Sequence, residues 1–507
     1  MFNTFPRRVA MLCVVAVAWA GGVRAQLSRL AEDVQYAASA QGTAGGGENA
    51  PFWFTNNRYG LGTSDNFGGV VRVSLFRNVE TDSLWFWRIG YGVELASPIN
   101  SQNGYFCVQQ AYADVEWKML RLSLGQKERP SELKNPHLST GGMTLGMNAR
   151  PIPQARLELP DFWAIPGTRG IFSIKAHIAY GWYTDNKWLR RFNAGTSNLY
   201  ATSSMFHSKA LFVRLGNREL FPLEVTGGLE MACQFGGRGW NVRPYSGDGL
   251  LQDVNLGGNP WTAFWPGGGD VNDENYTNAA GNHVGSWHLR LDWHREDWSL
   301  GLYMEHLFED HSQMFFQYGW KDMLVGLEAN LPRNRFLSTV LYEFNNTMYQ
   351  SGPIYHDQTV ENPQQISARD EYYANHIYGA WQMGGFVMGN PLVLSPLYNG
   401  YFGSEGTLSP QHNRVRVHHV GLMGSPAPEW TWRAMYTRHF SLGTYVKPVD
   451  DPATANYLLL EATYSPRRVR GLSLTAAYGH NDGSLLGRSD GAMLTVRFHG
   501  WLNRTRW

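Results

Sequence analysis

The chain has 507 residues, of which 14% are aromatic and 17% are charged, and its formal net charge at pH 7 is +1. Nucleic-acid binding requires a basic surface, so this charge balance argues against a nucleic-acid partner. The length fits several globular domains or a single large one.

The N-terminus has the pattern of a secretory signal peptide. Two arginines precede the apolar run 9–20, and small residues at 23 and 25 mark a cleavage site before Gln26. The run is too short to span a membrane, because a spanning helix needs about 20 apolar residues. We therefore expect residues 1–25 to be a signal peptide that is removed on export.

Strict alternation of apolar and polar side chains recurs along the mature chain. It appears in 71–75, 85–95 and 111–119, and again in 172–182 and 225–235. A period of two indicates β-strands with one apolar and one polar face. Further strands are predicted at 323–331, 336–344, 430–436, 457–464, 472–478 and 492–498.

The clearest strand pair is a β-hairpin around the short polar turn "REDW" (295–298). Trp287, Leu289, Leu291 and Trp293 alternate with polar residues before the turn, and Trp298, Leu300, Leu302 and Met304 alternate after it. Each arm runs about ten residues, the length of a tilted strand that crosses a membrane.

Two architectures fit these strands in an exported chain: a transmembrane antiparallel β-barrel, or a soluble β-sandwich or β-helix. No stretch after residue 25 approaches 18 consecutive apolar residues. Ionisable groups on the polar face favour the barrel, because a watery lumen accepts them and a dry sandwich core does not. Aromatic residues at strand ends, as in lipid-interface girdles, also favour it: Trp85, Trp182, Trp287, Trp293, Trp298 and Trp430.

Sixteen or eighteen strands of about ten residues leave a large surplus of sequence for loops and a plug. Three segments do not have the pattern of spanning strands: 125–166, 237–283 and 350–413. The first is rich in proline, which excludes a regular helix or a central strand through much of its length. We expect residues 26–507 to form one barrel domain that carries these three segments as insertions.

Aromatic residues in the second and third segments are candidates for stacking on sugar rings, because the CH-rich face of a pyranose packs on an aromatic ring. The candidate glycan-binding residues are Trp261, Trp265, Tyr276, Tyr372, Tyr373, His376, Tyr378 and Trp381. For any single ring of the second segment, a place in the loop's own apolar core is the favoured alternative. The third segment is too aromatic for disorder.

No catalytic motif is present: the sequence has no GxSxG, no HExxH and no phosphate-binding glycine loop followed by lysine. There is also no CxxC or Cys/His cluster for a structural zinc ion. We expect neither enzymatic activity nor a metal or cofactor. Cys107 and Cys233 remain after cleavage, and the sequence leaves open whether they pair.

Five stretches over most of the mature chain carry a family resemblance: "APFWFTNNRYG" (50–60), "QQAYADVEWKMLRLSLGQKE" (109–128), "LSTGGMTLGMNARPIPQARLELPDFWAIP" (138–166), "AYGWYTDNKW" (179–188) and "DEYYANHIYGAWQMGGFVMGNPL" (370–392). In this order they resemble the capsule-assembly Wzi family of outer-membrane barrels. The "NARPIPQ" run with the proline-bracketed segment after it is the most specific of these.

The resemblance implies an eighteen-stranded barrel in the bacterial outer membrane whose lumen is obstructed by a segment with short helices. It implies a lectin-like, non-enzymatic protein that binds exported capsular or other surface polysaccharide and helps to anchor the capsule. Its expected partners are that polysaccharide, outer-membrane lipid and the capsule export machinery. The alternative function is an outer-membrane porin for sugars or other small solutes.

Overall fold

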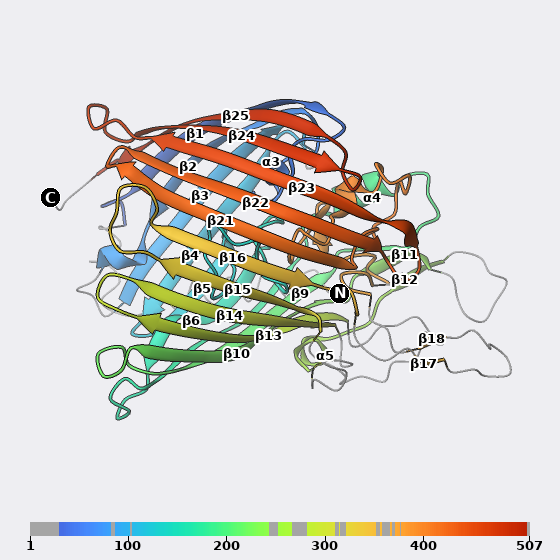
Figure 1. Cartoon of the computed structure of the whole chain (residues 1–507). Coiled ribbons are helices and arrows are strands. Elements are labelled where there is room, and N and C mark those ends of the chain that lie inside the picture. Colours follow the sequence, from blue (N-terminus) through green and yellow to red (C-terminus); the bar gives the residue numbers. More distant parts are fainter. Residues whose placement is uncertain are drawn as a thin grey trace.

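The computed structural model describes residues 30–82, 87–101, 104–242, 252–265, 281–309, 314, 321–350, 355–356, 366–367, 371–375 and 377–503. Eighteen antiparallel strands in these ranges form one closed sheet. Each pairs with the next barrel strand along the chain, and β1 (Gln35–Gly47) closes the barrel against β25 (Ser489–Trp501). The strands tilt around a wide barrel (Figure 1), so the predicted architecture is confirmed.

The other sixteen barrel strands follow in chain order. They are β2 (Phe67–Arg77), β3 (Trp87–Ile99), β4 (Cys107–Trp117), β5 (Leu120–Gln126), β6 (Gln154–Ala164), β7 (Phe172–Trp182), β9 (Met205–Leu215), β10 (Leu223–Phe235), β13 (Asn282–His294), β14 (Ser299–Glu309), β15 (Met323–Asn330), β16 (Thr339–Asn346), β21 (Val415–Ala427), β22 (Trp430–Gly443), β23 (Pro448–Tyr464) and β24 (Leu472–Gly483).

The barrel wall is apolar outside and polar inside. On β3, Val93 and Leu95 are exposed on the outer face, whereas Glu94 between them is buried in the lumen. On β21, His418 is exposed and its neighbour His419 is fully buried. Apolar side chains that face outward from a closed sheet match a hydrocarbon surround, and the inward polar groups match a wet lumen.

The predicted hairpin is formed by β13 and β14. Leu289 pairs with Met304 and Leu291 pairs with Leu302, and the turn between the strands covers 295–298. Leu289, Leu300 and Leu302 are exposed on the outer face, whereas Tyr303, the neighbour of Leu302, is buried in the lumen.

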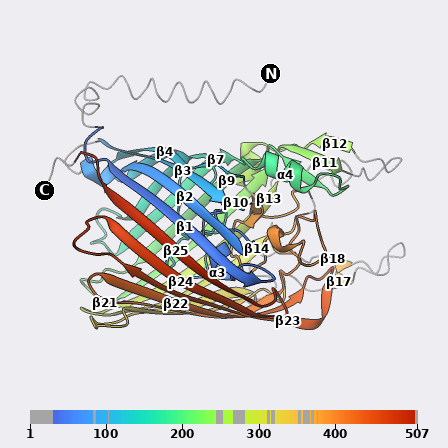
Figure 2. The same cartoon turned by 90° about the horizontal axis from the view of Figure 1, so that it is seen from above.

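The two ends of the barrel differ in the length of their connections. The connections that follow β2, β4, β6, β9, β13, β15, β21 and β23 are short and lie at the end where β1 begins and β25 finishes. The long connections all lie at the opposite end, seen on the right in Figures 1 and 2. In outer-membrane barrels the short turns are periplasmic and the long loops extracellular. We call these the short-turn end and the long-loop end.

The prediction that all of 125–166 lies outside the barrel wall is wrong for its last part, because 154–164 forms strand β6. Pro160 lacks a backbone N–H for the ladder. The register of β6 with β7 shifts between Leu159 and Trp163, which places Pro160 in a bulge. The proline therefore disrupts regular pairing only between Leu159 and Trp163, and the rest of 154–164 still forms a strand.

Smaller differences affect other predicted elements. The strand predicted at 336–344 is β16, Thr339–Asn346, and the segment 237–283 already includes the start of β13. Residues 131–135 of the proline-rich segment form turns and no helix.

The remaining elements are short. They are the helices α3 (Phe52–Thr55), α4 (Asn186–Phe192) and α5 (Pro260–Phe264), the 3-10 turns η1 (Val79–Asp82) and η3 (Pro396–Tyr398), and the strands β8 (Tyr200–Thr202), β11 (Arg238–Val242), β12 (Gln252–Asn255), β17 (Tyr355–His356), β18 (Ile366–Ser367), β19 (Gln382–Met383) and β20 (Phe386–Val387).

In the described ranges, no helix combines the length and the apolar character needed to cross a membrane. Cys107 and Cys233 are both buried and are not joined by a disulfide, which answers the question of pairing that the sequence left open. The predicted signal peptide, Trp85, Tyr276 and His376 lie outside the described residues.

Candidate functional site

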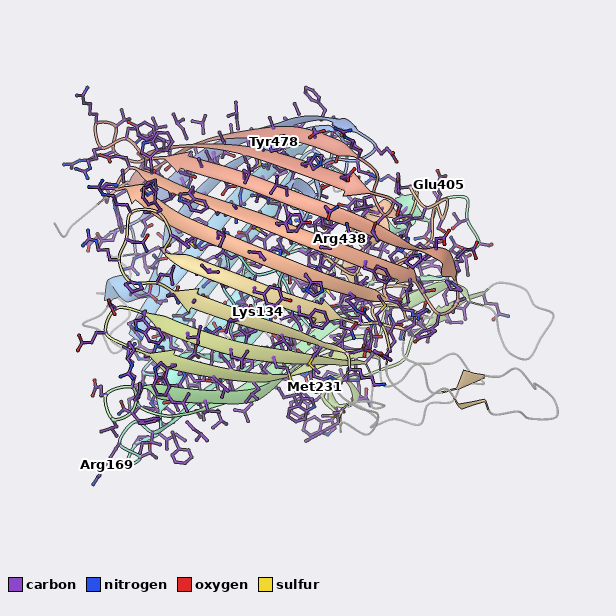
Figure 3. All side chains as sticks on the ribbon, viewed as in Figure 1. Lys134, Arg169, Met231, Glu405, Arg438 and Tyr478 are labelled. Carbon is purple, nitrogen blue, oxygen red and sulfur yellow. The ribbon has the colours of Figure 1, made fainter. Side chains whose placement is uncertain are left out.

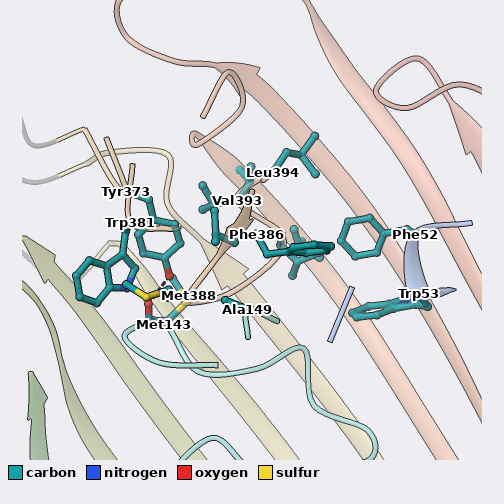
Figure 4. Close-up of a cluster of buried hydrophobic side chains, with 14 of the residues drawn as sticks. Phe52, Trp53, Met143, Ala149, Tyr373, Trp381, Phe386, Met388, Val393 and Leu394 are labelled. Atoms are coloured by element: carbon teal, nitrogen blue, oxygen red, sulfur yellow. Dashed lines mark hydrogen bonds between the residues drawn. The ribbon is translucent and has the colours of Figure 1, made fainter. Parts of the chain in front are cut away.

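The long-loop half of the lumen is filled by a plug. We use this name for three connections that fold back into the barrel: residues 48–66, which include α3, residues 127–153, and residues 371–413 as far as they are described. Together with inward-facing wall residues they form the largest apolar cluster of the protein. Figure 4 shows Phe52 and Trp53 of α3 on one side of this cluster, Phe386 and Val393 of the third connection toward its middle, and Met388 on the other side beside Trp381.

Four of the predicted glycan-binding residues belong to this plug. Tyr372, Tyr373, Tyr378 and Trp381 are each at most 3% exposed. Fully covered rings cannot stack on an external sugar, so in this structure they are packing residues of the plug.

Polar atoms on these rings are paired inside the plug. The Trp381 indole N–H donates to the Thr144 carbonyl at 2.9 Å, and the Tyr373 hydroxyl donates to the Met143 carbonyl. Burial raises the pKa of Tyr373 well above its usual value, so the phenol stays protonated and remains a donor. Buried Trp and Tyr side chains normally find such partners.

The β7–β9 connection pins the plug from the side. Asp185, immediately before α4, accepts hydrogen bonds from the Gly384 N–H at 2.9 Å and from the Gln382 side-chain amide at 3.1 Å. Burial raises the pKa of Asp185 although both donors favour its charged form. The landmark "GWYTDNKW" thus serves to hold the β19–β20 hairpin.

Trp261 and Trp265 have the opposite environment: their side chains are 73% and 60% exposed. Trp261 lies on α5 and Trp265 follows it, and Asn259 begins this helix. The Asn259 side chain accepts hydrogen bonds from the N–H groups of Trp261 and Thr262, and the Thr262 hydroxyl closes a capping box. Pro at the first helical position is preorganised for this geometry, so the sequence "NPWT" explains this short helix.

Helix α5 packs on the outside of the barrel wall near the long-loop end. His207 and Lys209 of β9 lie on the same face as the exposed Leu211 and Val213 and therefore point outward. Phe264 covers both: its ring centroid is 5.6 Å from that of His207 and 4.0 Å from the Lys209 ammonium. An outward-facing lysine is costly beside lipid, and the aromatic ring and the Phe264 carbonyl compensate for it.

A further contact fixes α5 to the wall, because the Tyr180 hydroxyl donates to the Pro260 carbonyl at 2.8 Å. Phe264 then lies between the two tryptophans, with ring centroids 6.1 Å from Trp261 and 5.0 Å from Trp265. Phe264 packs against the barrel wall, whereas the two indoles remain accessible, and glycan stacking by Trp261 and Trp265 stays a prediction.

The short-turn half of the lumen contains two cavities that sequence reasoning missed. Residues 127–137 of the second plug connection, which we call the arm, extend into this half and separate the two cavities. One cavity of about 730 Å³ lies against the inner faces of β5–β7, β9, β10, β13 and β15, and the other of about 930 Å³ lies against β1–β4 and β22–β25. We call the first the arginine chamber and the second the hydroxyl chamber, after side chains that line them.

Ion pairs tie the arm to the wall. Lys127 pairs with Asp114 at 2.5 Å, Glu128 with Arg72 at 2.8 Å, and Lys134 with Glu305 at 2.8 Å. The charged run "KERPSELK" (127–134) was the available signal, because a mixed-charge segment beside strands with inward charges can pair with them. The proline content of the segment, on which its interpretation depended, gives no information about ion pairs.

Glu230, His288 and Glu305 form the group of described residues whose spacing would suit a metal ion. The Lys134 ammonium lies 2.8 Å from Glu305, and the Ser286 hydroxyl donates to the same carboxylate. A cation therefore already neutralises this carboxylate, and the contacts are those of a buried ion-pair network.

No protein-family profile and no curated protein sequence matches the chain. The chain resembles the solved structure of Wzi from Escherichia coli, described as a carbohydrate-binding β-barrel of the outer membrane involved in group 1 capsule assembly. The TM-score is 0.53 at 11% identity, over 94% of this chain and 86% of Wzi. At this identity the likeness is one of fold, and it supports an outer-membrane β-barrel.

Two structures from Pseudomonas aeruginosa also match. OccK3 (OpdO) gives a TM-score of 0.46 at 11% identity, over 94% of this chain and 98% of OccK3. OprD gives 0.43 at 10% identity, over 93% of this chain and 95% of OprD.

Proposed function

We propose that the protein is a non-enzymatic, glycan-binding barrel that retains surface polysaccharide at the outer membrane. The observation that carries this proposal is the exposed Trp261 and Trp265 pair, which a capped and wall-bound helix holds at the long-loop end. Indole rings offer a flat apolar face to the CH-rich side of a pyranose. Many copies with weak sites retain a polymer through effective concentration.

Two observations support this proposal. The plug fills the long-loop half of the lumen, so binding on the outside does not depend on an open pore. The fold is similar to that of Wzi, a protein described as binding carbohydrate and acting in capsule assembly. The transfer of polysaccharide binding and a capsule role to this chain is part of the proposal, as is contact with a capsule export machinery.

The test is binding of the detergent-purified full chain to fluorescently labelled polysaccharide extracted from the surface of its own cells. We expect the double variant Trp261→Ala/Trp265→Ala to bind at least about tenfold more weakly, because each stacked ring contributes on the order of 1 kcal/mol. Trp430→Ala is the matched control, since Trp430 is exposed at the start of β22, at the short-turn end. Equal affinity of the double variant and the wild type would refute this site.

A porin for sugars or other small solutes is the second candidate. The two cavities favour it, because they extend the accessible part of the lumen from the short-turn end. Planar-bilayer recording separates the two candidates. A blocked lumen gives no steady conductance, whereas steady single-channel currents with unchanged polysaccharide binding in the tryptophan variant would favour the porin.

A further inference from the structure

The arginine chamber carries more Lys and Arg than Asp and Glu side chains on its lining. Most of its cations have a carboxylate partner. Arg156 pairs with Glu158 at 2.5 Å, Lys175 with Glu132 at 2.5 Å, and Arg290 with Asp292 at 2.9 Å. These pairs use three of the six acidic groups of the lining, and Arg290 also pairs with a fourth, Glu328, at 3.2 Å.

Arg129, Arg214 and the exposed Arg218 are left over: none of them has a carboxylate within 4.0 Å in the described parts of the chain. Arg129, on the arm, donates to the Ser123 hydroxyl at 2.9 Å and to the Lys127 carbonyl at 3.3 Å. Arg214, on β9, lies 3.6 Å from the centre of the Phe162 ring, and its Nε is buried without a hydrogen-bond partner.

A third polar group in the same lining is incompletely paired. His177 of β7 is 7% exposed, and its Nε2 is buried with no hydrogen-bond partner among the described groups. Its charged neighbours are Arg156, Arg129 and Lys175. Buried polar atoms are normally satisfied, so two unpaired nitrogen atoms on one cavity, Arg214 Nε and His177 Nε2, call for an explanation.

Electrostatics around Arg129 indicate what would satisfy these groups. Burial, together with the nearby Arg156, lowers the pKa of Arg129 to about 10, which still leaves the guanidinium charged at pH 7. An oxyanion beside Arg129 and Arg156 would reduce the repulsion between these two cations. It would also accept a hydrogen bond from the unpaired N–H of Arg214. Guanidinium groups match the planar, two-oxygen geometry of carboxylates and phosphates.

We infer that the arginine chamber is a binding site for an oxyanion, a carboxylate or a phosphate, on a small ligand that enters from the short-turn end. The volume of about 730 Å³ lies within the range of small-molecule sites. The lining near the mouth comes from β9, β10 and β13, where these strands meet the short turns. This site lies at the other end of the barrel from α5 and is independent of glycan binding by the tryptophan pair.

The hydroxyl chamber offers a matched control. Its lining on β23–β25 includes Thr463, Thr475 and Thr495, and it also contains Arg497, which is exposed to the lumen. The variant R497Q therefore removes the same charge from the same barrel in the other chamber. A nonspecific effect of net charge on anion binding would appear equally in R497Q and in an arginine-chamber variant.

The experiment is isothermal titration of the detergent-purified full chain with digalacturonate, with glycerol phosphate and with maltose at low ionic strength. We expect one of the two anions to bind and maltose not to bind. The double variant R129Q/R214Q should bind that anion at least about tenfold more weakly, and R497Q should stay within about twofold of the wild type. The preferred anion distinguishes an acidic sugar from a phosphorylated compound as the source.

Three results would overturn the inference: no anion binding by the wild type, unchanged affinity in R129Q/R214Q, or an equal loss in R497Q. Correct folding is checked by heat-modifiable electrophoretic mobility. If R129Q/R214Q does not fold, R129K/R214K replaces it, because lysine keeps the charge but loses the planar fork. A folded lysine variant with wild-type affinity for the anion would likewise contradict the proposed site.

Discussion

Single side chains decide how the plug is attached to the barrel wall. The Lys134 ammonium on the arm lies 2.8 Å from Glu305 on β14, and both side chains are almost completely buried (Figure 3 labels Lys134). The other oxygen of this carboxylate accepts from the Met143 N–H at 2.7 Å and from the Ser286 hydroxyl at 2.8 Å. The Glu305 carboxylate thus contacts two parts of the plug, the Lys134 side chain and the Met143 backbone, and it is fully buried from solvent.

Removing only one partner of this pair should be strongly destabilising. We expect Lys134→Met to lower the free energy of unfolding by about 3–5 kcal/mol, because it leaves the Glu305 carboxylate buried without its cation. The double variant Lys134→Met/Glu305→Gln should recover much of this loss. Urea titration in lipid vesicles, followed by tryptophan fluorescence, measures both. If the loss of unfolding free energy in the double variant equals the sum of the losses in Lys134→Met and Glu305→Gln alone, the two side chains are not coupled.

At the scale of elements, the plug is held together by close backbone approach between its segments. The Gly146 N–H donates to the Met388 carbonyl at 2.6 Å, and Gly389 lies against Tyr373 and Met143. A Cβ at Gly389 would overlap the Tyr373 hydroxyl and the Met143 carbonyl. Only glycine leaves room for this contact between the second and third connections.

We therefore expect Gly389→Ala to loosen the plug without breaking the barrel. Overpacking of this kind costs about 1–3 kcal/mol, and it should produce intermittent ion conductance in planar bilayers. Gly42→Ala is the matched control, because a Cβ at Gly42 has nothing within 4 Å. A variant with the stability and conductance of the wild type would show that this contact does not hold the plug.

At the scale of the whole molecule, the barrel has a direction. Glu405 in the third plug connection and Arg169 in the β6–β7 turn lie at opposite ends (Figure 3). The long connections, the plug and α5 belong to the end of Glu405, whereas both cavities open toward the end of Arg169. We therefore expect the protein to expose one surface outside the cell and a different one to the periplasm.

This direction can be measured by labelling introduced cysteines on intact cells with a membrane-impermeant maleimide. We expect Glu405→Cys to be labelled and Asp297→Cys, in the β13–β14 turn, to be labelled only after lysis. Both native positions are exposed, and the natural Cys107 and Cys233 are buried and give little background. Labelling of Asp297→Cys on intact cells would reverse the assignment of the two ends.

The sequence was a reliable guide to the barrel wall and a poor one to the lumen. Alternation over 85–95 or 287–304 is a local property of each strand, and together with the ionisable groups on the polar face it favours a closed sheet with lipid outside and water inside. Proline at 160 misled the prediction of β6, because a bulge is visible only when the partner strand is known.

The roles of individual aromatic residues depended on contacts distant in sequence. Tyr372, Tyr373 and Trp381 have the same composition signal as Trp261 and Trp265, yet the first three are covered by the plug and the last two are exposed. Composition and spacing determine which face of a strand is apolar, since neighbouring side chains alternate along one backbone. Which loop folds into the lumen, which one packs outside it, and which arginines remain without a carboxylate are decided by residues hundreds of positions apart, and only the folded barrel brings these together.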